Sequence, residues 1–323
     1  MGPRRNPYAP DMTMDLRQLR YFIAVAEEEH VTRAAERLGM QQPPLSQQIK
    51  AIERELDVQL FRRKARGVEL TECGRVLLEQ ARLVLERLDY ALLLTRRTAR
   101  GEQGRLCVGI APTGPFHPFV PRVIRAFREA YALVSVSLEE CLSKEAVERL
   151  RGERIDVAFV RAAVADAQGL IVHPLLEEPM VVALPSAHEL AGGDRRGEPL
   201  PLRALAEETF IVYGRTSGPG LLDATMAACL RAGFSPRLGQ EAPRITSTLG
   251  LVSAGLGVAL VPASMQRVRV DGVAYRRLMP AERPTALLNL VLRRGDPSAV
   301  VRNFSDLVRR AARGAQGTEE PAD

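Results

Sequence analysis

The sequence predicts an α/β protein in which a small helical unit, a hairpin and a long helix precede a domain of two lobes. Between residues 16 and 56, apolar residues recur at helical spacing in three runs, and a short turn containing glycine separates the last two. Between residues 77 and 92, an apolar stripe predicts one long helix. From Arg105 onward, apolar segments alternate with amphipathic ones, which indicates a largely parallel sheet.

The length, charge and N-terminal segment of the chain limit its class. With 323 residues it is long enough for two or three domains. A formal charge of +6 agrees with a polyanionic partner. No window reaches the roughly 18 apolar residues of a membrane span, and the first fifteen residues lack the apolar run of a signal peptide. We therefore expect a cytoplasmic protein without a membrane partner.

Metal and enzyme chemistry find little support in the sequence. The four cysteines and four histidines lack the spacing of a metal site. We expect reduced thiols, although a redox-sensing pair stays open. No nucleophile elbow is present, and Gly255 and Gly257 follow a predicted helix, so they do not form a dinucleotide fingerprint. The sequence therefore predicts neither an enzyme nor a metal or cofactor site.

The N-terminal runs predict a helix-turn-helix unit. Leu16, Leu19, Phe22, Ile23 and Ala26 form one amphipathic helix, and residues 32–38 form a second. A turn at residues 39–42 leads to a third helix, which the paired prolines Pro43 and Pro44 can start because proline suits a first helical turn. Its apolar stripe points to the core, and its opposite face, which would enter a major groove, carries Pro43, Gln47, Lys50 and Arg54.

A basic segment follows at the distance of a wing. Leu60-Phe61 and Val68–Leu70 can pair as strands around four positive charges in five residues, at Arg62, Arg63, Lys64 and Arg66. Such a run is often merely solvated. Its position after a recognition-type helix favours contact with DNA phosphates.

Thr71 can cap the long helix that comes next. The apolar stripe of this helix is formed by Leu77, Leu78, Ala81, Leu85, Leu88 and Leu92. Because the stripe exceeds what one small domain needs, we expect a linker helix that pairs two copies of the chain. The alternative is burial against its own domain.

The remaining segments predict two lobes with a ligand crevice between them. Such lobes hold a ligand at the carboxyl ends of strands and the N-termini of helices. The final strand and helix are expected to return to the first lobe, which makes both lobes discontinuous. The predicted divisions are a disordered leader at 1–13, a winged helix-turn-helix domain at 14–72, a linker helix at 73–103, lobe I at 104–176 and 276–313, lobe II at 177–275, and a disordered tail at 314–323.

Residues 14–74, with the motifs AAERL, QPPLS and LTECG in this order, resemble the winged helix-turn-helix of LysR-type transcriptional regulators. The segments ECLSKEA, IDVAFVR and LGLVSAGLGVALVPAS are similar to the family's effector domain, which has the fold of type 2 periplasmic binding proteins. The resemblance implies a DNA-binding regulator that a small molecule switches. A secreted solute-binding protein is disfavoured because the chain shows a helix-turn-helix and no secretion signal.

The resemblance also implies the DNA contacts. They are Gln42, Pro43, Ser46 and Gln47 on the recognition helix, Thr32 and Arg33 on the preceding helix, and Arg62, Arg63, Lys64 and Arg66 on the wing. Lys50 is added because helical spacing places it on the same outer face. Many relatives have arginine where this chain has Gln47. Glutamine pairs better with adenine than with guanine, so we expect an altered operator preference, unless Gln47 faces water.

Effector contacts follow from the resemblance in the same way, at Thr113, Gly114, Ser143, Arg161, Thr216 and Thr246. Hydroxyls and free N–H groups at helix N-termini suit an anion, so a small carboxylate is expected. The pattern is closest to the branch that senses aromatic acids and their ring-cleavage products, from which Leu142 and Pro112 depart. Helix capping remains the alternative for Thr113 and Ser143, and a structural ion pair is the alternative for Arg161.

The assembly implied is a homodimer through the linker helix and a homotetramer through further pairing. Its expected partners are an interrupted palindrome in promoter DNA and RNA polymerase, at the bacterial nucleoid. The sequence leaves open whether the regulator activates or represses transcription.

Overall fold

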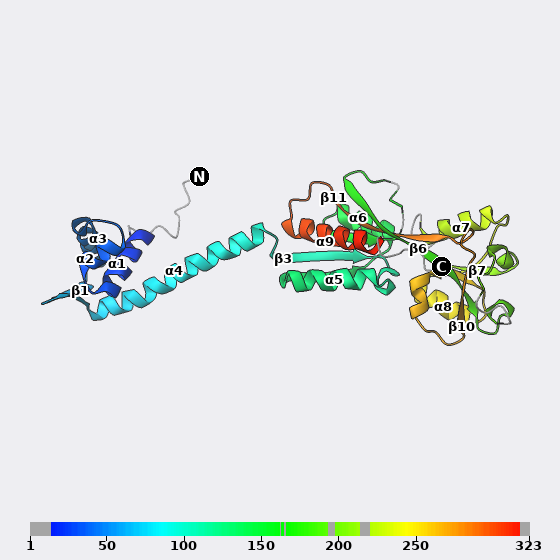
Figure 1. The fold of residues 1–323 in the computed structure, drawn as a ribbon, viewed down its shortest axis with the longest axis horizontal. Helices are drawn as coiled ribbons and strands as arrows, with labels where there is room; N and C mark the ends of the chain where they lie inside the picture. Colours follow the sequence, from blue (N-terminus) through cyan, green and yellow to red (C-terminus); the bar gives the residue numbers. More distant parts are fainter. Residues whose placement is uncertain (1–13, 162, 165, 193–197, 214–219, 317–323) are drawn as a thin grey trace, which may run out of the picture. The chain divides into compact units, whose positions relative to one another are not determined.

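The computed structural model describes residues 14–161, 163–164, 166–192, 198–213 and 220–316. The chain forms two compact units, which divide between Arg96 and Arg97. Figure 1 shows the helices and strands of each unit. The predicted leader at 1–13 lies outside the described residues, as does the part of the predicted tail after residue 316. Among the helices described, none combines the length and the apolar character needed to cross a membrane.

The first unit begins with three helices. They are α1 (Leu16–Glu28), α2 (Val31–Arg37) and α3 (Gln42–Leu56). Asp15 caps α1 through a reciprocal pair with Gln18. The core lies between the helices, where Phe22, Leu45 and Ile52 are fully buried. The predicted helix-turn-helix is confirmed, with Gly39 in the left-handed region at φ 65° in its turn.

The wing is an antiparallel hairpin of β1 (Phe61–Lys64) and β2 (Gly67–Leu70). The prediction placed the basic run between the strands. In the structure three of the four bases lie within β1, so the turn itself is only residues 65–66. Gly67 sits at φ 117°, and a Cβ there would lie 2.2 Å from the Glu29 carbonyl oxygen, so only glycine fits.

Helix α4 (Glu72–Ala99) follows the hairpin. The Thr71 hydroxyl accepts the Gly74 N–H at 3.0 Å, as predicted for a cap. The predicted stripe divides in two. Leu77, Leu78 and Ala81 pack against the core of the first unit, whereas Leu92 is exposed, together with Leu83, Val84, Tyr90 and Leu93 outside the predicted stripe.

Lobe I of the second unit is built on a mixed sheet. Among the described residues the sheet has seven strands in the order β10-β6-β11-β5-β3-β4, with β9 beside β6. In lobe I, β3 (Gln103–Ile110), β4 (Leu133–Glu140) and β5 (Val157–Val160) are parallel, and β11 (Thr285–Arg293) is antiparallel to β5. Helices α5 (Phe119–Ala130) and α9 (Ala299–Gln316) share one core with the sheet. Helix α6 (Ser143–Arg151) shares another.

Lobe II contains β7 (Thr209–Tyr213), β8 (Arg237–Ala242), β9 (Ala259–Pro262) and β10 (Val273–Arg277). Its helices are α7 (Leu221–Arg231) and α8 (Ile245–Ser253). Its short 3-10 helices are η2 (Glu189–Ala191), η3 (Leu202–Leu205) and η4 (Ala263–Arg267), whereas η1 (Gly114–Phe116) belongs to lobe I. Two apolar clusters form the core of this lobe.

The long strand β6 (Leu170–Pro185) belongs to both lobes (Figure 1). Its first part pairs with β11, and its last part pairs with β9 and β10. The sequence predicted a separate strand from about Glu178. The predicted return to lobe I at residue 276 falls inside β10, which still pairs with the lobe II end of β6. At the C-terminal end, α9 extends to Gln316, three residues into the predicted tail.

Candidate functional site

The outer face of α3 presents amides and bases to solvent. Gln42, Pro43, Gln47 and Lys50 are exposed, and Ser46 is half-buried. The Gln42 side-chain amide donates to the Ser46 hydroxyl at 2.7 Å, which orders the first turn of this face. The face is held in place from behind, because Leu45 and Ile49 are buried in the core. The structure therefore brings the predicted recognition residues together on one exposed surface.

The predicted residues of α2 lie at its first turn. Thr32 and Arg33 are both exposed. The Arg33 guanidinium donates to the Glu28 carbonyl oxygen at 2.5 Å and lies 3.9 Å from the Glu28 carboxylate. Arg33 is thus partly engaged within the unit.

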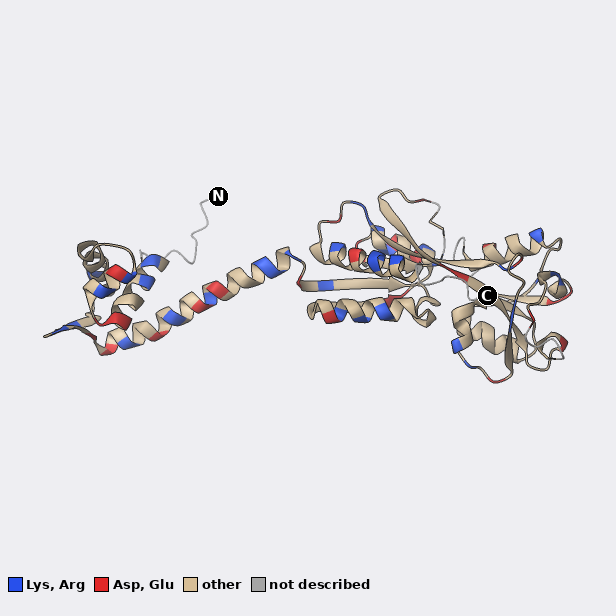
Figure 2. Cartoon of the chain, viewed as in Figure 1, with Lys and Arg blue, Asp and Glu red and all other residues tan. Residues whose placement is uncertain are grey.

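The wing carries an acid that the sequence interpretation did not consider. Arg62 Nε and Lys64 Nζ lie 2.9 and 3.0 Å from the same Glu69 oxygen. Hydrogen bonds from Arg62 and then from Lys64 hold the pKa of Glu69 at about 2, well below its usual value. Within the described residues, no ion pair is found for the two other bases, Arg63 and Arg66, and both are exposed. Figure 2 shows the positive charges along β1.

Glu53 was also missed, and it joins α3 to the wing. One of its carboxylate oxygens accepts the Leu60 N–H at 2.8 Å and the Phe61 N–H at 3.2 Å. The Leu60 residue is 1% exposed, so its N–H has no access to bulk water. The sequence signal was an acid on the half-buried side of α3, close to its end. The carboxylate fixes where the wing leaves the recognition helix.

In lobe I, the predicted effector residues follow the ends of adjacent parallel strands. Thr113 and Gly114 come after β3, and both are buried. A Cβ on Gly114 would lie 2.6 Å from an Ile110 methyl group, so this position leaves no room for a side chain. Thr113 precedes η1, but its side chain makes no capping hydrogen bond.

Ser143 opens α6 at the end of β4. The residue at the N-cap position is Leu142, not Ser143. The Ser143 hydroxyl instead accepts the Arg161 N–H at 3.2 Å, which ties the end of β4 to the end of β5. Helix capping, the alternative considered for Ser143, is therefore wrong, because Ser143 is the first residue of α6 and Leu142 occupies the N-cap position.

Arg161 is buried and forms the ion pair considered as its alternative role. Its guanidinium lies 2.7 Å from a Glu178 oxygen, and both side chains are 6% exposed or less. Within the described part of the chain, the guanidinium nitrogens make no hydrogen bond of good geometry, so the contact is mainly electrostatic. Burial lowers the pKa of Arg161, and the attraction of Glu178 opposes that change. Glu178 lies on β6 and also accepts the Ser264 N–H from η4, so the pair connects the two lobes.

Two further predicted residues belong to lobe II. Thr246 is exposed in the first turn of α8, and Thr216 lies outside the described residues. The N-terminus of α8 faces lobe I, because Arg244 just before it lies 3.6 Å from the Glu140 carboxylate at the end of β4. The ends of β3, β4 and β5 in lobe I and the N-terminus of α8 in lobe II thus lie at the junction between the lobes, where the sequence predicts a crevice.

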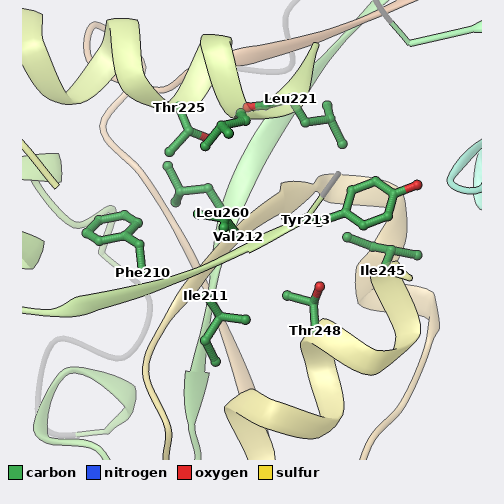
Figure 3. A pocket seen from close by; sticks show the side chains of 10 residues that line it. Phe210, Ile211, Val212, Tyr213, Leu221, Thr225, Ile245, Thr248 and Leu260 are labelled. Carbon is green, nitrogen blue, oxygen red and sulfur yellow. The ribbon is translucent and has the colours of Figure 1, made fainter. Parts of the chain in front are cut away.

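A small cavity in lobe II lies beside this border (Figure 3). It has a volume of about 20 Å³ and is lined by the β7 residues Phe210–Tyr213, by α7 and by α8. The Tyr213 hydroxyl is buried without a hydrogen-bond partner in the described part of the chain. Burial raises its pKa to about 12. Among the predicted effector residues that the structure describes, none lines this cavity, although Ile245 and Thr248 on either side of Thr246 do.

Known proteins share both parts of this architecture. Residues 16–75 match the family model described as bacterial regulatory helix-turn-helix protein, lysR family. Residues 99–313 match the model described as LysR substrate binding domain. The transcriptional regulator AlsR of Bacillus subtilis is 37% identical over 82% of this chain and 86% of its own length. The regulator BudR of Raoultella terrigena is 36% identical over 91% of this chain and 100% of its own.

A solved structure has the same fold over nearly the whole chain. Full-length CbnR complexed with its target DNA superposes with a TM-score of 0.79 at 29% identity, and the match covers 93% of this chain and 100% of that one. The relatives are transcriptional regulators rather than enzymes. The predicted fold class and function are confirmed at this level. The chain belongs to the LysR family of DNA-binding transcriptional regulators, with an N-terminal helix-turn-helix domain and a C-terminal domain that binds a small-molecule effector.

Proposed function

We propose that the effector is a small carboxylate bound in the crevice between the two lobes. One observation supports this proposal: Arg244, just before α8 in lobe II, lies 3.6 Å from Glu140, which shortly precedes α6 in lobe I. The two helix N-termini therefore meet at the junction between the lobes. Helix N-termini carry partial positive charge and free N–H groups, so two of them at one crevice favour an anion. Thr113, Gly114, Ser143 and Thr246 supply the surrounding hydroxyls and backbone groups.

Within this class we propose an aromatic acid or a product of aromatic ring cleavage. The support is the resemblance of ECLSKEA and IDVAFVR to the branch that senses such acids. Arg161 takes a structural role in this proposal, because Glu178 already compensates its charge. Thr216 stays a proposed contact on the strength of the resemblance alone.

The proposed DNA surface is the exposed face of α3, flanked by α2 and the wing. Gln42, Pro43, Ser46, Gln47 and Lys50 face base edges or adjacent phosphates in the major groove. Thr32 and Arg33 and the wing bases contact the backbone on either side. The prolines set the point at which α3 begins, so that Ser46 and Gln47 lie in its exposed first turns.

The proposed assembly is a homotetramer built in two steps. The exposed apolar residues of α4, from Leu83 to Leu93, support pairing of two linker helices. Paired helices place two recognition helices on the half-sites of an interrupted palindrome, and effector domains then pair as well. Bound at a promoter in the cytoplasm, the tetramer would meet RNA polymerase there.

Switching is proposed to follow from a change of angle between the lobes. The lobes share the continuous strand β6, so a ligand in the crevice can draw them together without breaking the sheet. A ligand shifts this equilibrium only if it binds one lobe arrangement better than the other. The change in lobe angle alters the spacing of the DNA-binding units and hence the bend of the DNA.

Footprinting on the promoter beside the protein's own gene tests the proposal. The full-length protein is incubated with the DNA, with and without a panel of aromatic and dicarboxylic acids. A footprint that shortens or changes its hypersensitive bands with one acid is expected. If the protein binds the promoter but no acid changes its footprint, DNA binding is supported and the proposal of a carboxylate effector is wrong. The variant Ser143→Ala, which removes one proposed effector contact, should give the same footprint as the wild type without acid but should no longer respond to the acid.

A further inference from the structure

The wing holds one acid among its four bases, on the same face as two of them. In the antiparallel register Arg62 stands directly opposite Glu69. Lys64 is two residues further along β1, so its side chain points to the same face. Both cations converge on one carboxylate oxygen, at 2.9 and 3.0 Å. Hairpin geometry therefore imposes this three-residue cluster.

The cations of the cluster remain accessible while the acid between them is more covered. The side chains of Arg62 and Lys64 are 63% and 57% exposed, whereas that of Glu69 is 29% exposed. A phosphate can therefore approach both cations from outside without any movement of the hairpin. A phosphate bound there accepts hydrogen bonds from groups that otherwise donate to Glu69. The phosphate also lies close to the Glu69 carboxylate, which carries the same sign of charge.

We infer that Glu69 limits how strongly the wing holds the DNA backbone, because it competes with phosphates for Arg62 and Lys64. Arg63 and Arg66 then supply the uncontested contacts of the wing. This inference rests on the proposed contact between the wing and DNA. Phosphate contacts add affinity for every sequence alike. By weakening them, Glu69 increases the share of the binding free energy that comes from base contacts of α3.

Glu69→Gln tests the inference, with Glu72→Gln as its matched control. Each substitution removes one carboxylate of similar size that pairs with an arginine, but Glu72 pairs with Arg75 at the start of α4, outside the wing. Binding of the full-length variants to a random-sequence duplex and to the promoter fragment is measured by fluorescence anisotropy, between roughly 50 and 200 mM salt.

Glu69→Gln is expected to tighten binding to both duplexes about five-fold at low salt, as removal of one like charge near a phosphate predicts. The slope of log affinity against log salt should become steeper by about 0.9. Glu72→Gln should change both quantities much less. Equal effects of the two variants would reveal a general charge effect and overturn the inference, as would unchanged or weaker binding of Glu69→Gln.

Arg63→Ala separates failure of this inference from failure of the wing contact. If Arg63→Ala weakens binding to both duplexes and Glu69→Gln does not tighten it, the wing contacts DNA and the role of Glu69 is wrong. If Arg63→Ala leaves both affinities unchanged, the wing contact itself is wrong, and the inference about Glu69 falls with it.

Discussion

Glu69 is a residue whose ionisation the fold changes strongly. Its pKa is held at about 2, against a usual 4.5, by hydrogen bonds from Arg62 and then from Lys64. A carboxyl group with a lower pKa in the folded state stabilises that state above the unfolded pKa. The contribution of Glu69 is thus present above pH 4.5 and is lost as the pH falls from 4.5 towards 2.

A carboxyl titration followed by NMR checks this prediction. The midpoint of Glu69 is expected near pH 2 in the wild-type protein. In Arg62→Gln it should move upward towards 4.5, because the first of the two hydrogen bonds is lost. A wild-type midpoint close to 4.5 would show that the pairing does not persist in solution.

Single residues were predicted best where chain-local chemistry decides their position. The exposed amides of α3 follow from helical periodicity and are found on one face. Ser143 was singled out correctly as the residue that opens a helix, yet its partner is the N–H of Arg161, eighteen residues later. Periodicity carries no information on such a contact, since it forms only because β4 and β5 both pair with β3 and end on the same side of the sheet.

At the scale of elements, the junction between α3 and β1 depends on Glu53. Its carboxylate accepts two backbone N–H groups of the segment that enters the wing. We predict that Glu53→Ala lowers the free energy of unfolding of the first unit by about 2–3 kcal/mol, because a buried N–H loses a charged acceptor. Glu53→Gln should cost less, since its amide oxygen can still accept.

Chemical denaturation followed by circular dichroism measures these changes. Glu36→Ala is the control, because Glu36 is an exposed acid on α2, away from the wing. It should leave the stability nearly unchanged. If Glu53→Ala matches the control, the carboxylate does not hold the junction.

Most helices were predicted because each has an apolar stripe with the right period. The strand β6 was only partly predicted. Two prolines and the Glu177-Glu178 pair interrupt its apolar pattern, which therefore reads as two segments. Pairing with β11 on one part and with β9 and β10 on the other keeps the strand continuous.

For the whole molecule, the connection between the lobes contains a buried ion pair. Arg161 follows β5 in lobe I, and Glu178 lies on the strand that both lobes share. Removal of one partner from such a pair leaves an uncompensated buried charge, which costs about 3–5 kcal/mol. We predict a loss of this size in the effector domain for Glu178→Leu. The double variant Arg161→Leu/Glu178→Leu should recover most of it, because no unpaired charge remains.

Denaturant unfolding of the full chain compares the two variants. If the double variant is as unstable as the single one, the charge of Arg161 is not what makes the loss of Glu178 costly. The effector response in the footprint adds a second readout, since the pair lies where the lobes meet.

The sequence by itself determined the helix-turn-helix with its basic wing, the long helix, and the two-lobed α/β domain, but not the strands β8 and β10 or the first part of β6. These follow from local periodicity, turn residues and charge, all of which act over a few residues of chain. Only the tertiary structure decided that Glu69 pairs with the bases of the wing and that Glu53 on α3 holds the segment that enters it. It also decided that Arg161 pairs with Glu178 and that one strand serves both lobes. The physical reason is that ion pairs, hydrogen bonds to buried N–H groups and strand pairings depend on which residues lie close together in space. The spacing of residues along the chain does not give this information.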